Sequence, residues 1–379
     1  MNTSQALPNV IGCDIGGANL KLADCFGSCA SRVFPMWLQA DQLGSTLRDM
    51  LGKFPVTETT YLAVTMTAEL ADCFATRREG VQQILLQLEH AFDPLKTLVY
   101  AVGNRWLTSA EAVAAPWDVA ASNWHALATW IGIRDAERVD LVLDIGSTTV
   151  DIIPMLFDVQ GFSRPATPAR TDRDRLEFGQ LVYTGLERTP IAAIVRAVIV
   201  QGRTCPVMAE HFATSDDCYI VVGLTPEWPG DCDTADSRPR TRANAHARLA
   251  RMIGEDAETL PIEASQQIAQ QVINAQADQV AEAIERNLSK ASRNITAAGH
   301  GRALAQLAIA KLTQPVPTVT WLADELSPAA ARSAPALAVA HLLASHLLRA
   351  QNDWGNRSAL NPKILNGINP QPFPQFGPD

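Results

Sequence analysis

A short motif occurs twice in this chain of 379 residues. Each copy has an apolar run that ends in Asp-Ile-Gly, a turn of small residues and a second apolar run. Residues 10–26 read VIGCDIGGANLKLADCF, and residues 139–156 read VDLVLDIGSTTVDIIPML. Two apolar runs joined by such a turn predict a β-hairpin. The copies lie roughly one domain length apart, so the repeat predicts two similar domains that face each other. Two unrelated hairpins with glycine turns are the alternative.

Both turns carry residues that suit phosphate. Their tips offer backbone N–H groups and hydroxyls to phosphate oxygens, and the carboxylates beside them suit a hydrated Mg²⁺ ion. Asp14 and Asp144 are the predicted Mg²⁺ ligands. When the two copies are aligned, Lys21 falls where Asp151 lies, so only the first turn carries an ammonium point charge. The predicted phosphate-binding residues are Asp14, Gly16, Gly17, Asn19, Gly146, Ser147, Thr148 and Thr149.

A third glycine-containing turn, GHGR at residues 299–302, follows a predicted strand and precedes a predicted helix. The helix N-terminus would favour an anion, and the glycines would admit a flat ring or a sugar. A purely structural strand-to-helix turn is the alternative. The chain has neither G-x-G-x-x-G nor G-x-x-x-x-G-K-[ST], which argues against a Rossmann dinucleotide site and a P-loop.

The composition is that of an ordinary globular protein, with 47% hydrophobic and 19% charged residues. The net charge of −9 and the lack of a long basic stripe argue against a nucleic-acid partner.

We expect no signal peptide, because MNTSQALPNV has no charged segment followed by an apolar run. The stretch 334–348 is too short and too polar to span a bilayer. The seven cysteines form no C-x-x-C pair, which predicts reduced thiols in a cytoplasmic protein. A homo-oligomer is compatible with the sequence.

Hydrophobic periodicity predicts the order β-β-β-α-β-α-β-α over residues 10–133, and this order restarts at Val139. It also predicts a helix over Thr189–Gly202, but it does not decide between strand and helix for Asp217–Leu224. We expect a final helix over Pro335–Leu348. The predicted divisions are a first domain at 1–137, a second domain at 138–349 with a polar insertion near 225–260, and an extended or partly disordered tail at 350–379.

These residues also carry a family resemblance. The chain resembles the superfamily of sugar kinases, actin and the heat-shock chaperones. Within it, the chain resembles the hydantoinase A/oxoprolinase-like proteins linked to the tetrahydromethanopterin-dependent one-carbon pathway, which include the methanofuran-biosynthesis synthases. The matching stretches are CDIGGANLKLA, LDIGSTTVDIIP, GQLVYTGLERTP, AEHFAT, TADSRPRT and RLARMIG, which span most of residues 10–302. Gln180 departs from the pattern, where we would expect Glu in GELVYTG.

The resemblance implies an α/β fold of two ribonuclease H-like (actin-like ATPase) domains, with mixed sheets flanked by helices and a cleft between them. It implies a transferase that joins an aminomethyl-furanylmethyl diphosphate to the phenol of a tyrosine-like or glutamyl-tyramine-like acceptor and releases pyrophosphate. The product would be an aryl alkyl ether in a methanofuran-type or methylofuran-type cofactor. Lys21 and Mg²⁺ would neutralise the leaving pyrophosphate.

Lys21, Asp144 and Asp151 are the predicted catalytic residues, with Asp144 or Asp151 as the base for the phenol. Tyr183 could instead be a hydrogen-bonded core tyrosine. Other functions stay open: an ATP-dependent kinase or hydantoinase-type amidohydrolase that binds Mg·ATP, or a non-catalytic nucleotide-binding regulator. The predicted substrate-binding or nucleotide-binding residues are Tyr183, Thr184, Gly185, Gly299, Gly301 and Arg302.

Overall fold

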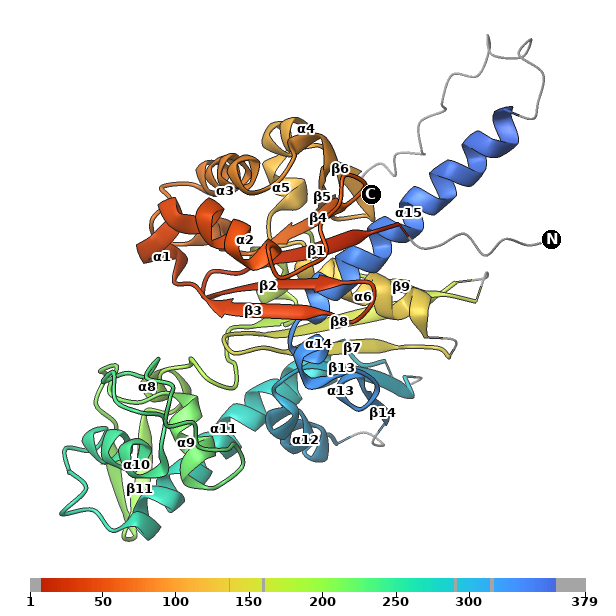
Figure 1. The fold of residues 1–379 in the computed structure, drawn as a ribbon. Helices are drawn as coiled ribbons and strands as arrows, with labels where there is room; N and C mark the ends of the chain where they lie inside the picture. The colour runs from red at the N-terminus through yellow and green to blue at the C-terminus, as the bar shows by residue number, and fades with distance from the viewer. Residues whose placement is uncertain (1–7, 136, 159–160, 290–291, 314–316, 359–379) are drawn as a thin grey trace.

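The computed structural model describes residues 8–135, 137–158, 161–289, 292–313 and 317–358. They form two mixed β-sheets with helices between and around them (Figure 1). The predicted α/β architecture with two similar sheets is therefore confirmed.

The first sheet has β1 in its interior, paired antiparallel with β2 and parallel with β4. Its strands follow the order β3-β2-β1-β4-β5-β6. They are β1 (Val10–Ile15), β2 (Asn19–Asp24), β3 (Cys29–Val33), β4 (Tyr61–Met66), β5 (Thr97–Ala101) and β6 (Arg105–Leu107). The accompanying helices are α1 (Met36–Gln39), η1 (Ala40–Gln42), α2 (Leu43–Leu51), η2 (Ala68–Leu70), α3 (Arg77–Ala91), η3 (Pro94–Lys96), α4 (Ser109–Ala114) and α5 (Pro116–Val119).

The second sheet repeats this plan. Its strands follow the order β10-β8-β7-β13-β14, and β9 pairs with β8 outside that path. Like β1, β7 has one antiparallel neighbour, β8, and one parallel neighbour, β13. The strands are β7 (Leu141–Ile145), β8 (Val150–Phe157), β9 (Ser163–Pro165), β10 (Leu181–Val182), β13 (Asn294–Gly299) and β14 (Thr318–Trp321). The helices that follow these strands are α11 (Ile262–Asn287), α12 (Arg302–Ala310), α13 (Leu322–Glu325) and α14 (Pro328–Arg332).

Two helices, α6 (Asn123–Arg134) and α15 (Ala334–Ser358), lie between the sheets (Figure 1). Side chains alternate between the two faces of each strand. Ile11, Cys13 and Ile15 of β1 therefore pack outward with α2 and α3, whereas Val10 packs inward with α6 and α15. By the same alternation, Asp14 belongs to the inward set.

The second sheet shows the same alternation. Leu141, Leu143 and Ile145 of β7 pack outward with α11 and α12, whereas Val142 packs inward with α6 and α15. Asp144 therefore also belongs to the inward set. The strand pattern alone thus turns the carboxylates at the ends of β1 and β7 toward the space between the sheets.

Glycines allow the central helices to approach the strands closely. A Cβ atom on Gly12 would lie 1.8 Å from the carbonyl oxygen of Ala336 in α15, and one on Gly132 in α6 would lie 1.9 Å from that of Ser163 in β9. These helices also cross the predicted domain division at residues 137 and 138. The earlier helix, α6, packs against β8 and β9, and the late helix, α15, packs against β1, β2 and β4. Each sheet thus packs against a helix that the sequence analysis placed in the other domain, the second sheet against α6 and the first sheet against α15.

Between β10 and α11 the chain forms a separate lobe, seen at the lower left of Figure 1. The predicted helix over 189–202 is wrong beyond Ile194. A β-hairpin of β11 and β12 follows, and Gln201 and Gly202 turn it with φ values of 49° and 78°. For residues 217–224, where periodicity did not decide between strand and helix, the structure has a helix that ends at Val221. The elements of this lobe are α8 (Ile191–Ile194), β11 (Ala197–Val200), β12 (Arg203–Pro206), α9 (Ser215–Val221) and α10 (Arg242–Arg251), and α7 (Asp172–Glu177) precedes β10.

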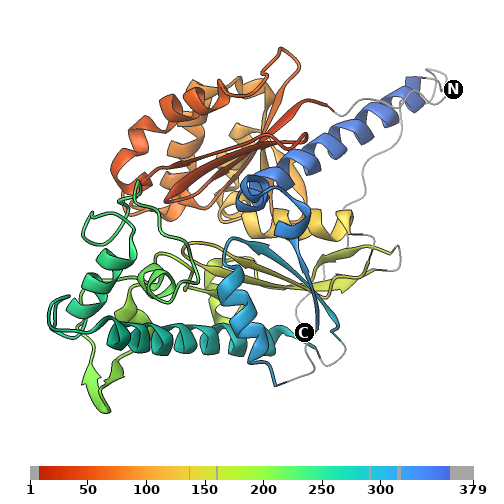
Figure 2. The same cartoon turned by 60° about the horizontal axis from the view of Figure 1, so that its bottom comes forward.

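The predicted polar insertion near 225–260 contains α10, which contributes Ala245, Leu249 and Ala250 to the core with α9 and α11. This part of the insertion is therefore core, because α10 is amphipathic. Figure 2 shows the whole lobe beside the long helix α11.

The C-terminal prediction holds only in part. The last helix runs to Ser358, so the predicted extended tail begins as helix, and residues 359–379 lie outside the described residues.

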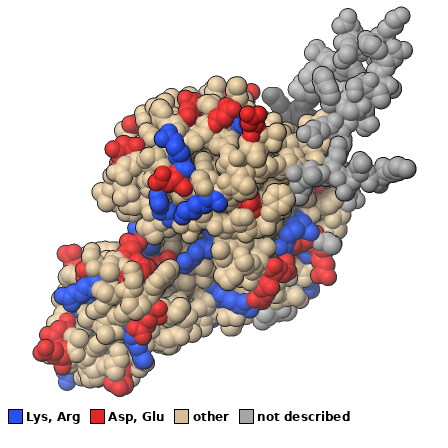
Figure 3. Space-filling model, in the orientation of Figure 1, with Lys and Arg blue, Asp and Glu red and all other residues tan. Residues whose placement is uncertain are grey.

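Among the described helices, none has the length and apolarity that a membrane crossing requires. All seven cysteines are free thiols. On the face drawn in Figure 3, positive and negative side chains are interspersed.

Candidate active site

The two predicted turns share one backbone geometry. In the first, the N–H of Gly16 donates to the carbonyl oxygen of Asn19 at 3.0 Å. In the second, the N–H of Gly146 donates to that of Thr149 at 2.9 Å. The repeated sequence thus forms two equivalent hairpin tips, one at the end of each central strand.

Strand pairing places corresponding side chains opposite each other. Asp14 is paired with Lys21 across β1 and β2, and Asp144 is paired with Asp151 across β7 and β8. The sequence alignment of Lys21 with Asp151 is therefore also a structural equivalence. The two tips differ in charge at this one position.

At each tip two carbonyl groups already accept hydrogen bonds, those of Gly17 and Ala18 at the first and of Gly146 and Ser147 at the second. Backbone N–H groups from the next segment of the chain donate to them, at distances of 2.8–3.1 Å. The donors are Phe34 and Met36 at the first tip and Leu186, Glu187 and Arg188 at the second. None of the described residues accepts a hydrogen bond from the N–H groups of Gly17, Ala18, Ser147 or Thr148. Tips with satisfied acceptors and free donors are suited to bind an anion.

The tips border a cavity of about 130 Å³, which we call the central cavity. Asn123 and Pro335 also line it, so the first turns of α6 and α15 lie at its wall. Helix N-termini attract negative charge, which adds to the effect of the free N–H groups. The predicted residues that line this cavity are Asp14, Gly16, Gly17, Asn19, Lys21, Asp144, Gly146, Ser147, Thr148, Thr149, Asp151 and Gly299.

Asp14 and Lys21 form an ion pair at the cavity wall. The Lys21 ammonium lies 3.7 Å from Oδ2 of Asp14, whereas Oδ1 of Asp14 is buried without a hydrogen-bond partner in the described structure. Burial raises the pKa of Asp14, Lys21 opposes the rise, and Asp151 adds to it. An unpartnered buried carboxylate oxygen is costly unless a ligand or ion satisfies it.

Asp144 is perturbed more strongly. Burial raises its pKa to about 7, the negative charges of Asp151 and Asp14 contribute, and Lys21 opposes them. A carboxylate that is destabilised in this way gains from a cation placed beside it. The same property would suit a proton acceptor near neutral pH.

Asp151 has a permanent cationic partner. The Arg175 guanidinium in α7 pairs with its carboxylate, donates to the carbonyl oxygen of Gln180 at 3.1 Å, and stacks over the ring of Trp124 at 4.4 Å. Arg175 is buried, so this pair holds Asp151 in a fixed orientation. Gln180, the position that departs from the family pattern, is buried and accepts a hydrogen bond from Thr167.

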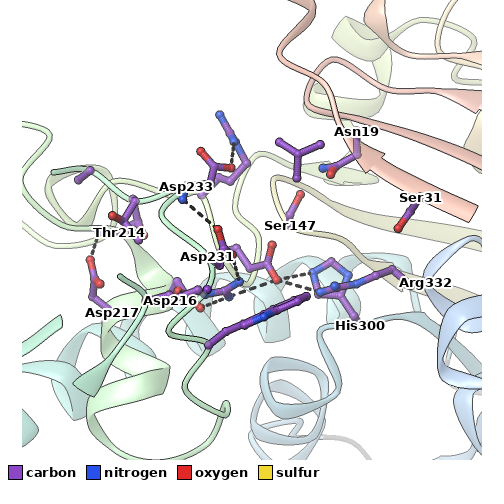
Figure 4. A pocket seen from close by; sticks show the side chains of 18 of the residues that line it. Asn19, Ser31, Ser147, Thr214, Asp216, Asp217, Asp231, Asp233, His300 and Arg332 are labelled. Atoms are coloured by element: carbon purple, nitrogen blue, oxygen red, sulfur yellow. Dashed lines mark hydrogen bonds and ion pairs between the residues drawn. The ribbon is translucent and has the colours of Figure 1, made fainter. Parts of the chain in front are cut away.

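A cavity of about 460 Å³, which we call the insertion-side cavity, lies on one side of the central cavity. The two share Asn19, Lys21, Ser147, His300 and Arg332 in their walls. Figure 4 shows Asn19 and Ser31 reaching it from the first sheet and Asp216 and Asp231 from the lobe between β10 and α11, with His300 and Arg332 near its floor.

Glu187 lines the insertion-side cavity and pairs with three of its other wall residues. It lies 3.1 Å from Arg332, 3.3 Å from Arg240 and 3.3 Å from His300. Although burial opposes the effect, these partners hold its pKa down at about 2. Arg240 also pairs with Asp216, so its guanidinium is already engaged by carboxylates.

A further cavity, of about 340 Å³, lies on the other side of the central cavity. We call it the aromatic cavity, because Trp37 and Tyr183 line it. Tyr183 is 67% exposed, so the alternative of a hydrogen-bonded core tyrosine does not hold.

The remaining predicted residues do not line the three cavities, and two of them, Gly185 and Gly301, pack against the second hairpin. A Cβ on Gly185 would lie 2.5 Å from backbone atoms of Ser147, and one on Gly301 would lie 2.1 Å from Ile145. Thr184 is buried and accepts a hydrogen bond from Gln276. Arg302 pairs with Asp324 and stacks over Trp321 at 4.6 Å, and it lines none of the three cavities.

The donor set around the central cavity fits Mg²⁺ in one particular way. Among the described residues there is no group of three or more His, Cys, Asp or Glu side chains placed to hold a metal ion. Mg²⁺ commonly takes one or two carboxylates and completes its shell with water and substrate phosphates. The unpartnered Oδ1 of Asp14 and the destabilised carboxylate of Asp144 match that mode, so the residues fit a Mg²⁺ that arrives with a phosphate ligand.

Comparison with known proteins identifies the family. The model of the family described as Hydantoinase/oxoprolinase matches residues 60–346. The chain belongs to this family. The second hairpin lies inside the matched region, and the first hairpin precedes it.

Among its relatives, this hydantoinase/oxoprolinase-family chain is 35% identical over 254 residues to a protein of Methanocaldococcus jannaschii named (4-{4-[2-(gamma-L-glutamylamino)ethyl]phenoxymethyl}furan-2-yl)methanamine synthase. That alignment covers 66% of this chain and 72% of the relative. A protein of the same name from Methanococcus vannielii is 28% identical over 182 residues, which cover 48% of this chain and 79% of the relative.

The fold of this family member resembles that of a nucleotide-free acetone carboxylase, with a TM-score of 0.52 and 12% identity. The match covers 88% of this chain and 70% of the other. At that identity the likeness concerns the fold alone. Together with the duplicated sheet order, it supports the expected fold of two similar mixed sheets flanked by helices.

Several residues of the site escaped sequence reasoning. Arg175 lies in the charged stretch 171–177, in which the sequence analysis names no site residue, although Thr171 and Asp174 form a capping box that marks the start of α7. Glu187 stands in the matching stretch GQLVYTGLERTP, but its sequence context does not reveal its partners His300 and Arg332. Ion pairs between distant segments leave no local pattern.

Proposed function

We propose that this protein is a transferase of methanofuran-type or methylofuran-type cofactor biosynthesis. It joins an aminomethyl-furanylmethyl diphosphate to the phenol of a glutamyl-tyramine-like acceptor and releases pyrophosphate. The observation that carries the proposal is the central cavity, where two tips with free N–H groups meet one ammonium group and carboxylates. The names of the two synthases that the chain resembles support the choice of substrates.

The reaction forms one bond and breaks another. The furan ring donates electrons to its CH₂ group, so the bond from that carbon to the diphosphate oxygen breaks with carbocation character, and pyrophosphate leaves with the electron pair. The phenol oxygen forms the new bond to the carbon. Its proton passes to a carboxylate of the cleft, for which Asp144 and Asp151 are the candidates.

The protein's part is mainly electrostatic. Negative charge grows on the diphosphate as the bond breaks, and fixed donors aimed at that charge stabilise the transition state more than the bound substrate. Lys21 and the N–H groups of the two tips are such donors. The phenol has a reference pKa of about 10, so a carboxylate that accepts its hydrogen bond increases its nucleophilicity.

Mg²⁺ fits the same scheme. Asp14 and Asp144 would hold it, and it would supply positive charge to the pyrophosphate oxygens. We propose Asp14 and Asp144 as the Mg²⁺ ligands, and we propose that the protein acts in the cytoplasm.

Heat stability in the presence of ligands tests the proposal against the ATP-dependent alternatives. Mg²⁺ with pyrophosphate should raise the melting temperature at least as much as Mg²⁺ with ATP, since a ligand at about 100 times its Kd adds about 2.7 kcal/mol. Strong stabilisation by ATP with none by pyrophosphate would favour the kinase or amidohydrolase. Stabilisation by ATP without any turnover of substrates would favour the regulator.

A further inference from the structure

The aromatic and insertion-side cavities both border the central cavity, and Arg188 lines both of them. The aromatic cavity shares Gly17, Thr67, Asn123, Thr148 and Asp151 with the central cavity, among other residues. The insertion-side cavity shares a different set of wall residues with it. A diphosphate between the tips would therefore have a separate opening on each side.

The two openings occupy equivalent places in the duplicated fold. Thr67 follows β4 and donates from its N–H to the carbonyl oxygen of Ile15 at 2.9 Å. Gly301 follows β13 and donates in the same way to Ile145 at 3.1 Å. Thr67 borders the aromatic cavity and His300, beside Gly301, borders the insertion-side cavity. The two side cavities thus lie at equivalent places of the duplicated fold, next to the central cavity.

Part of the lining of the aromatic cavity is apolar and exposed to solvent, although charged residues such as Asp172 and Arg188 also line it. Trp37 is 39% exposed, Leu70 is 57% exposed and Tyr183 is 67% exposed. Trp37 and Leu70 come from the first domain, and Tyr183 comes from the segment after β10. The Arg188 guanidinium lies 5.4 Å from the centre of the Trp37 ring, which orients that ring. Covering these side chains with a flat apolar ring would be favourable.

The charged groups at the two openings differ. On the aromatic side the shared wall carries Asp151, whose orientation Arg175 fixes. On the other side the shared wall carries Lys21, His300 and Arg332. That wall also offers neutral acceptors in Asn19, Ser147 and His300, but a carboxylate is the stronger acceptor for a hydroxyl that must lose its proton, and an ammonium or guanidinium group is a donor only. The opening at Asp151 is therefore the one that suits a phenol.

We propose that the aromatic cavity binds the phenolic acceptor, with its ring beside Trp37 and Tyr183 and its hydroxyl directed at Asp151. This inference rests on the proposed function. The ring then lies next to the diphosphate in the central cavity, with the phenol oxygen facing the carbon that is to be attacked. The insertion-side cavity then binds the aminomethyl-furan part of the diphosphate substrate.

Substitutions in the two side cavities test this assignment. Tyr183→Ala and Trp37→Ala should each raise KM for the acceptor at least about tenfold, because each removes an aromatic contact. The KM for the furanylmethyl diphosphate and the thermal shift with Mg²⁺-pyrophosphate should stay within about twofold of the wild type. The matched control is Trp228→Ala, since Trp228 is 57% exposed and lines the insertion-side cavity. It should leave the acceptor KM unchanged.

The opposite pattern, with the acceptor KM raised by Trp228→Ala and unchanged by Tyr183→Ala and Trp37→Ala, would overturn the assignment. Calorimetric titration of tyramine into the protein with Mg²⁺-pyrophosphate separates this inference from the proposed function. Wild-type binding that Tyr183→Ala abolishes, without any ether formed in turnover assays, would support the phenol site and refute the synthase. Ether formation with acceptor binding that neither variant alters would support the synthase and refute the phenol site.

Discussion

The Lys21 ammonium lies 3.7 Å from the carboxylate of Asp14, its partner across β1 and β2. The equivalent position of the second hairpin holds Asp151, a negative charge. The two halves of a duplicated cleft are therefore electrostatically different. One tip is equipped to bind an anion directly, and the other is richer in carboxylates that a cation would satisfy.

Replacement of Lys21 by Ala should lower kcat by about 10²–10³-fold, because one electrostatic contact with a developing charge is lost. The fold should persist, since the side chain is 25% exposed and lies at a cavity wall. Pyrophosphate release under saturating substrates measures the effect. Lys53→Ala, an exposed position in the loop after α2, is the control and should turn over normally. Turnover of Lys21→Ala within about twofold of the wild type would contradict the role.

Asp144→Asn should weaken Mg²⁺ binding instead. The substitution keeps the shape and removes the charge that a divalent cation needs. We expect a smaller thermal shift with Mg²⁺-pyrophosphate at low Mg²⁺ and its partial recovery at high Mg²⁺. Asp278→Asn, at a surface ion pair with Lys311, should behave as the wild type. A Mg²⁺ dependence of the Asp144→Asn shift that equals that of the wild type would exclude this ligand.

Gly185→Ala should damage the second tip. Its new Cβ would lie 2.5 Å from the backbone of both Ser147 and Thr148, so the tip would have to move. Such overpacking typically costs about 1–3 kcal/mol of stability. Chemical denaturation and pyrophosphate titration would both report it. Gly52→Ala, where the nearest atom to the Cβ is at 3.5 Å, is the matched control. Equal behaviour of the two variants would show that the tip has room to relax.

The repeated motif was enough to predict the two hairpins, because strand alternation and turn chemistry are local properties. It also predicted that Lys21 and Asp151 are equivalent, which the strand registers confirm. Local pattern did not predict β11 and β12. There Val198 is buried and Ile199 is exposed, which is strand alternation, but the apolar residues around them also fit a helix. The turn at Gln201 and Gly202 lacks the usual Asn-Gly signal.

The ion-pair partners of the site residues could not be predicted from the sequence, for a different reason. Arg175 reaches Asp151 across 24 positions, and Arg332 reaches Glu187 across 145. Such pairs arise when the fold brings distant segments together, so only a structure reveals them. The two central helices illustrate the same limit, since α6 and α15 serve the cores of both sheets.

Glu69 should make the protein less stable as the pH rises. It is 1% exposed, and among the described residues no side chain hydrogen-bonds to its carboxylate. Burial raises its pKa from 4.5 to about 7. The folded state thus binds a proton that the unfolded state releases, so this contribution to stability is present below about pH 4.5 and is lost as the pH rises through about 7.

Glu69→Gln should remove that dependence. At pH 8 the variant should be more stable than the wild type by on the order of 3 kcal/mol, and near pH 4.5 the two should be similar. Denaturant unfolding at a series of pH values measures the difference. A wild type and variant whose stabilities differ by the same amount at every pH would show that folding does not shift the pKa of Glu69.

The most direct test of the account is turnover by the purified protein. Aminomethyl-furanylmethyl diphosphate and γ-glutamyl-tyramine would be incubated with it and Mg²⁺, without ATP, and the ether would be measured by mass spectrometry and pyrophosphate by a coupled assay. If the proposed reaction is right, ether and pyrophosphate form in equal amounts, and both are lost in Lys21→Ala. No ether without ATP, together with ATP hydrolysis when ATP is supplied, would contradict it.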